Sequence, residues 1–242
     1  MTAVLRASPD APPPNRRLGA ALVGRAEALA WLELHAVAGR LVTVLGLGGI
    51  GKSTLVDAFL AARTAEVTTL RVTRDGGMRA ALGVVLGLGA HADVTKVERA
   101  LRARTGFLRL EDAEGLSADE VAWIVATRTT TPGLAWLATS RVPLDGGDDV
   151  LRLGPLPHDD ARALFERLLP SDASAPGYAW NTVVAKLDGF PLALRLAAPW
   201  TRWSPPDELE RALSQSLALL DDEATDGRTL EGALRWASGR LG

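Results

Sequence analysis

A stretch of nine residues combines glycines, a lysine and two hydroxyl side chains at a spacing that suits phosphate binding. Gly46–Thr54 reads GLGGIGKST and fits the pattern G-x-x-x-x-G-K-[ST] in full. Its glycines let backbone N–H groups converge on phosphate oxygens, because no Cβ stands in the way. We expect Lys52 to reach the β and γ phosphates, Ser53 to ligate Mg²⁺ and Thr54 to bind the α phosphate. The loop residues expected to surround the phosphates are Gly48, Gly49, Ile50 and Gly51.

Two acidic residues follow an apolar run and offer the second anion that a metal ion at such a loop needs. Phe107–Leu110 leads into Glu111 and Asp112, and an acid at the end of a neighbouring strand is the usual metal partner. We therefore expect both acids to act with Ser53 as metal ligands and to take part in catalysis. Glutamate is longer than the usual aspartate, and Arg109 breaks the apolar run, so hydrolysis is expected to be slow or absent. The alternative is a solvated acidic loop after an edge strand.

An arginine occupies the equivalent place after the next apolar run. Leu134–Thr139 is followed by Ser140 and Arg141, and polar groups at the carboxyl ends of parallel strands face the ligand crevice of an open sheet. Arg141 is therefore predicted to contact the γ phosphate. A surface arginine in a loop is the alternative.

Positioning these residues requires a sheet whose strands run in one direction. Short apolar runs alternate with helical patterns along the first two thirds of the chain, which favours βαβ units and a parallel sheet flanked by helices. The runs that we expect to form strands are 41–45, 67–73, 107–110, 134–139 and 150–153.

The pattern changes after Pro155, where only helical segments follow. Apolar residues recur at helical spacing over 158–169, 180–187, 192–197 and 206–220. We therefore expect an α/β domain over residues 18–155 and a small all-helical domain over 156–225. Residues 1–17, which hold four prolines, are expected to form a flexible arm.

Composition excludes several classes of protein. Forty-seven per cent of the residues are hydrophobic, which is enough for a core, and a net charge of −2 supplies no field for nucleic acid, so direct nucleic-acid binding is not expected. The absence of cysteine removes thiolate chemistry and suits a reducing cytoplasm. No apolar run reaches about 18 residues, so no membrane span is expected.

Further motifs resemble those of the STAND class of P-loop ATPases, the NB-ARC- and NACHT-like switches. VGR before Glu27, FLRLEDAEGL, LATSRVPL and LDGFPLAL are similar to motifs that these proteins carry in the same order. The likeness is nearest to the nucleotide-binding module of bacterial AfsR-like and LuxR-type regulators. It implies an AAA+-like P-loop fold with a helical lid. It also implies that Val23 and Arg25 help to hold adenine and that Pro191 packs on the base. Helix punctuation is the alternative role of Pro191.

The same resemblance implies domains beyond the two already described. Residues 226–242 are similar to the start of a winged-helix domain, of which this chain would hold a truncated part, and effector or sensor domains are expected outside the chain. A homo-oligomer in the activated state is a further expectation.

These observations favour an ATP- or ADP-binding molecular switch with weak hydrolysis. A small-molecule or nucleotide kinase would share the phosphate loop, but no arginine-rich lid is evident. A degenerate module that holds nucleotide without hydrolysing it is the other alternative. A GTPase is disfavoured, because no N-K-x-D sequence occurs.

Overall fold

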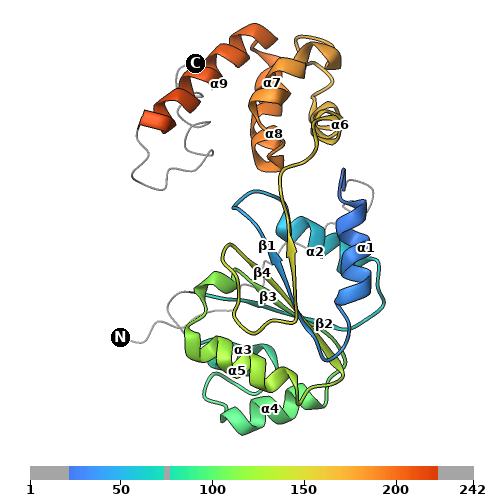
Figure 1. Ribbon diagram of the computed structural model, residues 1–242, viewed down its shortest axis with the longest axis vertical. Coiled ribbons are helices and arrows are strands. Elements are labelled where there is room, and N and C mark those ends of the chain that lie inside the picture. The colour runs from blue at the N-terminus through green and yellow to red at the C-terminus, as the bar shows by residue number, and fades with distance from the viewer. Residues whose placement is uncertain (1–21, 74–76, 223–242) are drawn as a thin grey trace.

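The structure of the protein is a computed structural model that describes residues 22–73 and 77–222 (Figure 1). The expected arm over 1–17 and the expected winged-helix segment over 226–242 lie outside the described residues. None of the described helices combines the length and the apolar character needed to cross a membrane.

Five parallel strands form one sheet in the order β2-β3-β4-β1-β5. The predicted parallel sheet flanked by helices is therefore confirmed. The β-branched run of β1 and the whole of β4 are buried, as expected for strands covered on both faces. The strands are β1 (Leu41–Leu45), β2 (Val67–Arg71), β3 (Gly106–Glu111), β4 (Leu134–Ser140) and β5 (Asp149–Arg152).

Helices cover both faces of this sheet (Figure 1). Alternate residues of each strand point to opposite faces, so the sheet contributes to two cores. Leu32 of α1 and Phe59 of α2 pack on one face, and Leu82 of α3, Leu101 of α4 and Ile124 of α5 pack on the other. The helices are α1 (Ala26–His35), α2 (Lys52–Ala61), α3 (Met78–Val85), α4 (Val94–Arg102) and α5 (Ala118–Arg128).

Strand β3 differs from its expected form. Its run was predicted to be broken at Arg109, yet the strand is continuous and lies between β2 and β4, away from the sheet edge. Arg109 is only 7% exposed and pairs with Asp57 of α2 at 2.5 Å and with Glu111 at 2.6 Å. The buried charge is tolerated because two carboxylates neutralise it.

The strand order decides which loops meet. Strand β4 lies between β1 and β3, and all three run in the same direction. Their carboxyl ends therefore form one edge, where Gly46 follows β1, Arg141 follows β4 and Asp112 follows β3.

A helical unit follows β5, and within the described part of the chain no strand occurs after Arg152. It has a core of its own, in which Phe165, Trp180 and Leu194 are fully buried. We call residues 156–222 the helical unit; Figure 1 shows it beyond the carboxyl edge of the sheet. Its elements are α6 (His158–Leu168), η3 (Gly177–Trp180), α7 (Asn181–Lys186), α8 (Pro191–Ala197), η4 (Ala198–Arg202) and α9 (Pro206–Asp222).

Candidate functional site

The glycine-rich loop joins β1 to the N-terminus of α2. Gly49 and Gly51 have φ values of 77° and 98°. Residues with a side chain rarely adopt this backbone conformation, so both positions favour glycine. Gly51 is the N-cap of α2, whose first N–H groups have no partner within the helix and carry partial positive charge. The loop and helix end therefore form an anion-binding geometry.

Lys52 lies at the start of α2 and folds back over the loop. Its Nζ donates hydrogen bonds to the carbonyl oxygens of Gly46 at 2.8 Å and Leu47 at 3.0 Å. Burial lowers the pKa of this ammonium below its ordinary value; Glu114 and Asp112 oppose that effect, and the nearby Arg141 adds to it. Lys52 and Arg141 are thus two neighbouring basic side chains at the loop, with Glu114 and Asp112 as nearby acids.

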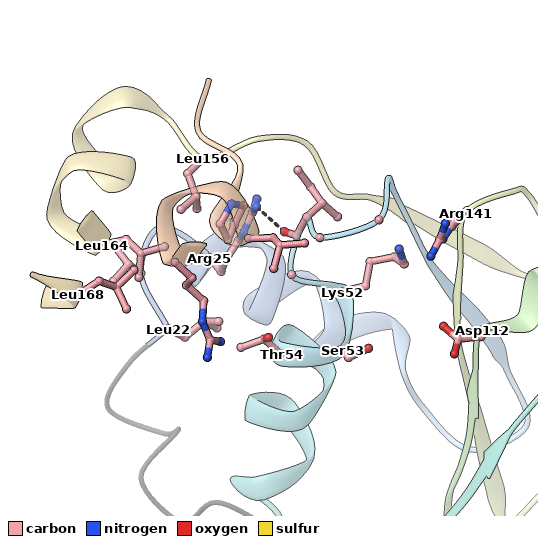
Figure 2. A pocket seen from close by; sticks show the side chains of 18 residues that line it. Leu22, Arg25, Lys52, Ser53, Thr54, Asp112, Arg141, Leu156, Leu164 and Leu168 are labelled. Carbon is pink, nitrogen blue, oxygen red and sulfur yellow. Dashed lines mark hydrogen bonds between the residues drawn. The ribbon is translucent and has the colours of Figure 1, made fainter. Parts of the chain in front are cut away.

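A cavity of about 450 Å³ lies between the loop and the helical unit (Figure 2). Every residue proposed from the sequence for nucleotide or metal binding lines it, apart from Glu111. The lining residues are Leu22, Val23, Arg25, Gly48, Gly49, Ile50, Gly51, Lys52, Ser53, Thr54, Asp112, Arg141, Leu156, Leu164, Leu168, Pro191, Leu192 and Arg195.

The two ends of the cavity differ in character. Figure 2 shows Leu164 and Leu168 at one end, and Lys52, Arg141 and Asp112 at the other. The cavity therefore suits a ligand with an apolar part and an anionic part, because each end matches one of them.

The helical unit touches the loop directly. The backbone N–H of Leu192 donates to the carbonyl oxygen of Gly49 at 3.2 Å. A Cβ at Gly49 would lie 2.8 Å from the Leu192 side chain, so the glycine also permits this close approach. Pro191 begins α8 at its first turn and lies beside Gly51.

Arg25 links the glycine-rich loop to the segment that connects β5 with the helical unit. Its Nη2 donates to the carbonyl oxygens of Ile50 at 3.2 Å and Gly154 at 2.8 Å. Burial lowers the pKa of Arg25, and the charge of Asp160 raises it. Arg25 therefore lines the cavity while part of its guanidinium is engaged by backbone.

The two predicted acids have different surroundings. The Glu111 carboxylate forms the ion pair with Arg109 and is absent from the cavity wall. Asp112 lies in the wall, at a φ of 55°, and its Oδ2 accepts a hydrogen bond from Arg71 Nε at 2.9 Å. Of the two acids, the structure thus directs Asp112 rather than Glu111 toward the loop. No group of three potential metal-binding side chains occurs among the residues described.

Sequence reasoning missed several residues of this site. Glu114 holds Arg141 at the loop, and its only sequence signal was its place in the acidic turn after β3. Arg195 and the aliphatic wall come from the helical unit, where their spacing indicated only helix. The missed wall residues are Leu22, Leu156, Leu164, Leu168 and Leu192.

Comparisons with known proteins bear on the fold. No protein-family model and no curated protein matches the sequence. Among solved structures, the chain is similar to the Signal Transduction ATPase with Numerous Domains (STAND) protein with a tetratricopeptide repeat sensor from Pyrococcus horikoshii. The identity is 18% and the TM-score 0.54, over 81% of this chain and 32% of that one. This chain therefore spans about a third of the length of that protein.

A second similar structure is one of katanin, from a study of its self-assembly. The identity is 12% and the TM-score 0.56, over 89% of this chain and 82% of that one. At these identities the likeness concerns the fold alone. The chain has the P-loop NTPase α/β fold that STAND and AAA-type ATPases share.

Proposed function

We propose that this chain is the ATP- and ADP-binding switch module of a STAND-type signalling or regulatory protein. One observation carries the proposal: the cavity has the phosphate-binding loop on one side and the helical unit on the other. A nucleotide bound there would contact both parts of the chain. A change in its phosphate state could then alter how the helical unit packs on the sheet, as in hinged domain closure.

The character of the cavity supports a nucleotide. Its volume of about 450 Å³ is within the usual range of small-molecule sites. Phosphates would lie at the loop, near Lys52 and Thr54, while the uncharged base would lie toward the aliphatic end. Val23 and Pro191 are the residues proposed to hold adenine, because both line the cavity and resemble adenine-contacting positions of the STAND class.

The residues present also fit a magnesium ion. Ser53 and Asp112 line the same cavity and offer hydroxyl and carboxylate oxygens, the hard donors that Mg²⁺ prefers. Glu111 is less available, because its carboxylate is paired with the buried Arg109 and does not line the cavity, whereas the partner of Asp112, Arg71, is exposed. When bound, the ion would neutralise charge on the β and γ phosphates. Lys52 would bind the same phosphates directly, and Arg141 would contact the terminal one.

Hydrolysis is proposed to be slow. The acid at the usual catalytic strand end is held by a buried arginine, and small displacements of catalytic groups cost large factors in rate. The same ion pair favours the second candidate, a module that holds nucleotide without hydrolysing it. Single-turnover cleavage of ATP, measured beside Glu111→Asp, distinguishes the two.

The wider setting belongs to the same proposal. By its resemblance to AfsR-like and LuxR-type regulators, the chain would work in the cytoplasm with C-terminal effector or sensor domains, and would form a homo-oligomer when activated. The similar protein from Pyrococcus horikoshii is itself described as carrying a tetratricopeptide repeat sensor.

The proposal is tested by titrating the protein with ATP, ADP and GDP in a calorimeter. We expect both adenine nucleotides to bind well ahead of GDP. Lys52→Ala should weaken ATP and ADP binding roughly 10- to 100-fold, because it removes a charge-assisted contact worth about 1.5–3 kcal/mol. Lys96→Ala, at an exposed site on α4, is the matched control. Unchanged affinities in Lys52→Ala, or no adenine preference, would refute the proposal.

A further inference from the structure

One carboxylate fixes Arg141 at two points. Glu114 Oε1 lies 3.1 Å from Arg141 Nε, and Glu114 Oε2 accepts a hydrogen bond from the Arg141 backbone N–H at 3.2 Å. Both oxygens are thus used by a single partner residue. The Glu114 side chain is only 15% exposed, while that of Arg141 is 58% exposed. The carboxylate is therefore the more buried member of the pair, and the arginine is the more exposed one.

This contact determines where the guanidinium lies. Arg141 Cζ, Nη1 and Nη2 are all 3.4–3.6 Å from the point that a Cβ at Gly48 would occupy, so the planar group lies flat against the phosphate loop. Figure 2 shows it beside Lys52 at the charged end of the cavity. Within residues 22–73 and 77–222, neither Nη group has a hydrogen-bond partner. The two Nη groups of Arg141 are therefore available to donate hydrogen bonds to an anion in the cavity.

The two contacts have different consequences for the side chain. The bond to the backbone N–H anchors Glu114 to the end of β4, a strand that is buried along its whole length. The bond to Nε then sets the direction of the guanidinium plane. Without Glu114, the long and exposed side chain would be free to leave the loop, because no other described residue holds its charged group.

Charge at the loop supports the same role. Lys52 and Arg141 are like charges that disfavour each other, and Glu114 offsets this effect on the pKa of Lys52. The carboxylate therefore stabilises a pair of neighbouring cations at the phosphate-binding end of the cavity.

We infer that Glu114 is a positioning residue that sets the preference of this site for a nucleoside triphosphate over a diphosphate. It does so through Arg141, whose free Nη groups would meet the terminal phosphate that a diphosphate lacks. Lys52 and the loop would bind the phosphates that both ligands share, so Glu114 should affect the two ligands unequally. The inference rests on the proposed function of the cavity.

The test is a double-mutant cycle read out as the ratio of two affinities. Binding of ADP and of the non-hydrolysable analogue β,γ-imido-ATP, both with Mg²⁺, is measured by calorimetry for the wild type, Glu114→Gln, Arg141→Ala and the double variant. We expect Glu114→Gln to weaken the triphosphate about tenfold and ADP less than twofold. In the Arg141→Ala background, Glu114→Gln should leave the ratio unchanged. Glu208→Gln, an exposed site on α9, is the charge-matched control.

A second variant separates position from charge. Glu114→Asp keeps the negative charge beside Lys52 but is one methylene too short to make both contacts with Arg141. It should lower the triphosphate preference much as Glu114→Gln does, and it provides the measurement if Glu114→Gln does not fold, as judged by circular dichroism.

Three results would overturn the inference. An equal loss for both nucleotides would mean that Glu114 acts on the loop in general, and full retention of the preference in Glu114→Asp would mean that charge alone matters. Unchanged affinities for both nucleotides in both variants would mean that Arg141 needs no such support. If the wild type bound neither nucleotide, the proposed function would fall together with the inference, and this outcome is distinguishable from the other three.

Discussion

Arg109 illustrates how one buried charged residue can determine which of two neighbouring acids lines a cavity. A charge in the middle of a covered strand is costly unless it is paired, and Arg109 takes Asp57 and Glu111 as partners. The Glu111 carboxylate, paired with Arg109, does not line the cavity, whereas Asp112 lines it beside the loop. The neighbouring acids therefore have different surroundings, since Glu111 pairs with a buried arginine and Asp112 lines the cavity.

This separation gives a prediction for the two acids. Asp112→Asn should reduce the gain in ATP affinity that Mg²⁺ provides by roughly 10-fold, because it removes an anion at the proposed metal position. Glu111→Gln should leave most of that gain intact but should lower the free energy of unfolding by about 1–2 kcal/mol, since it leaves Arg109 with one partner. Calorimetry with and without Mg²⁺, and urea unfolding, measure the two effects. A reversed pattern would place Glu111 at the metal.

At the scale of elements, helix α5 is tied to its surroundings by a capping box. Ser117 Oγ accepts from the Glu120 N–H at 3.3 Å, and Glu120 Oε2 accepts from the Ser117 N–H at 3.0 Å. Glu120 Oε1 also accepts from the Met78 N–H at 2.9 Å, which satisfies the first turn of α3. One carboxylate therefore holds the N-termini of two helices on the same face of the sheet.

Replacing this carboxylate should lower stability in a pH-dependent manner. Burial acts to raise the pKa of Glu120, but hydrogen bonds from Ser117 and Met78 outweigh it, so the pKa lies below its ordinary value. Its contribution is thus present above the pKa of the unfolded chain and is lost as pH falls through the folded value. Glu120→Gln should cost about 1–2 kcal/mol at pH 7 and less near pH 3.

Urea unfolding at both pH values measures this effect. Asp119→Asn is the control, because it removes a charge from the same helical turn at an exposed position. An equal loss in the two variants would show that the helix dipole, rather than the capping network, accounts for the stabilisation.

At the scale of the whole molecule, a few contacts join the helical unit to the sheet. The Leu192 N–H bonds directly to the loop, and Arg25 holds the segment that leads into the unit by donating to the Gly154 carbonyl. Within the unit, its first residue is fixed by the bond from the Leu156 N–H to the Gly189 carbonyl at 2.8 Å. A Cβ at Gly189 would lie 2.2 Å from the Leu156 carbonyl oxygen, so this glycine permits the close approach. A ligand in the cavity would add contacts across the same junction.

Ligand binding should therefore stabilise the whole chain. ADP at about 100 times its Kd should add about 2.7 kcal/mol to the free energy of unfolding, with a corresponding rise in Tm.

Leu164→Ala, which shortens a side chain in the aliphatic wall, should weaken ADP binding several-fold. Leu34→Ala, at a site 74% exposed on α1, is the control. Thermal unfolding at several ADP concentrations checks both, and an ADP-independent Tm would contradict them.

Local patterns in the sequence were sufficient to predict most of the fold. A β-branched run bounded by glycines predicted β1, and the contiguous GLGGIGKST motif predicted the loop at the start of α2. These predictions succeed because the responsible interactions join residues close together in the chain. Strand β3 was less well predicted, since one of the two carboxylates that neutralise Arg109, that of Asp57, lies 52 residues earlier in the chain.

The sequence by itself thus determined a glycine-rich loop between a strand and a helix, its parallel sheet and the change to helices alone over the described residues 156–222. Only the tertiary structure decided that Asp112 rather than Glu111 faces the loop, that Glu114 holds Arg141, and that leucines of the helical unit form the opposite wall of the cavity. The physical reason is that these contacts join residues far apart in the chain. They arise from the insertion of β4 between β1 and β3 and from the packing of the helical unit against the loop, and neither is visible in local spacing.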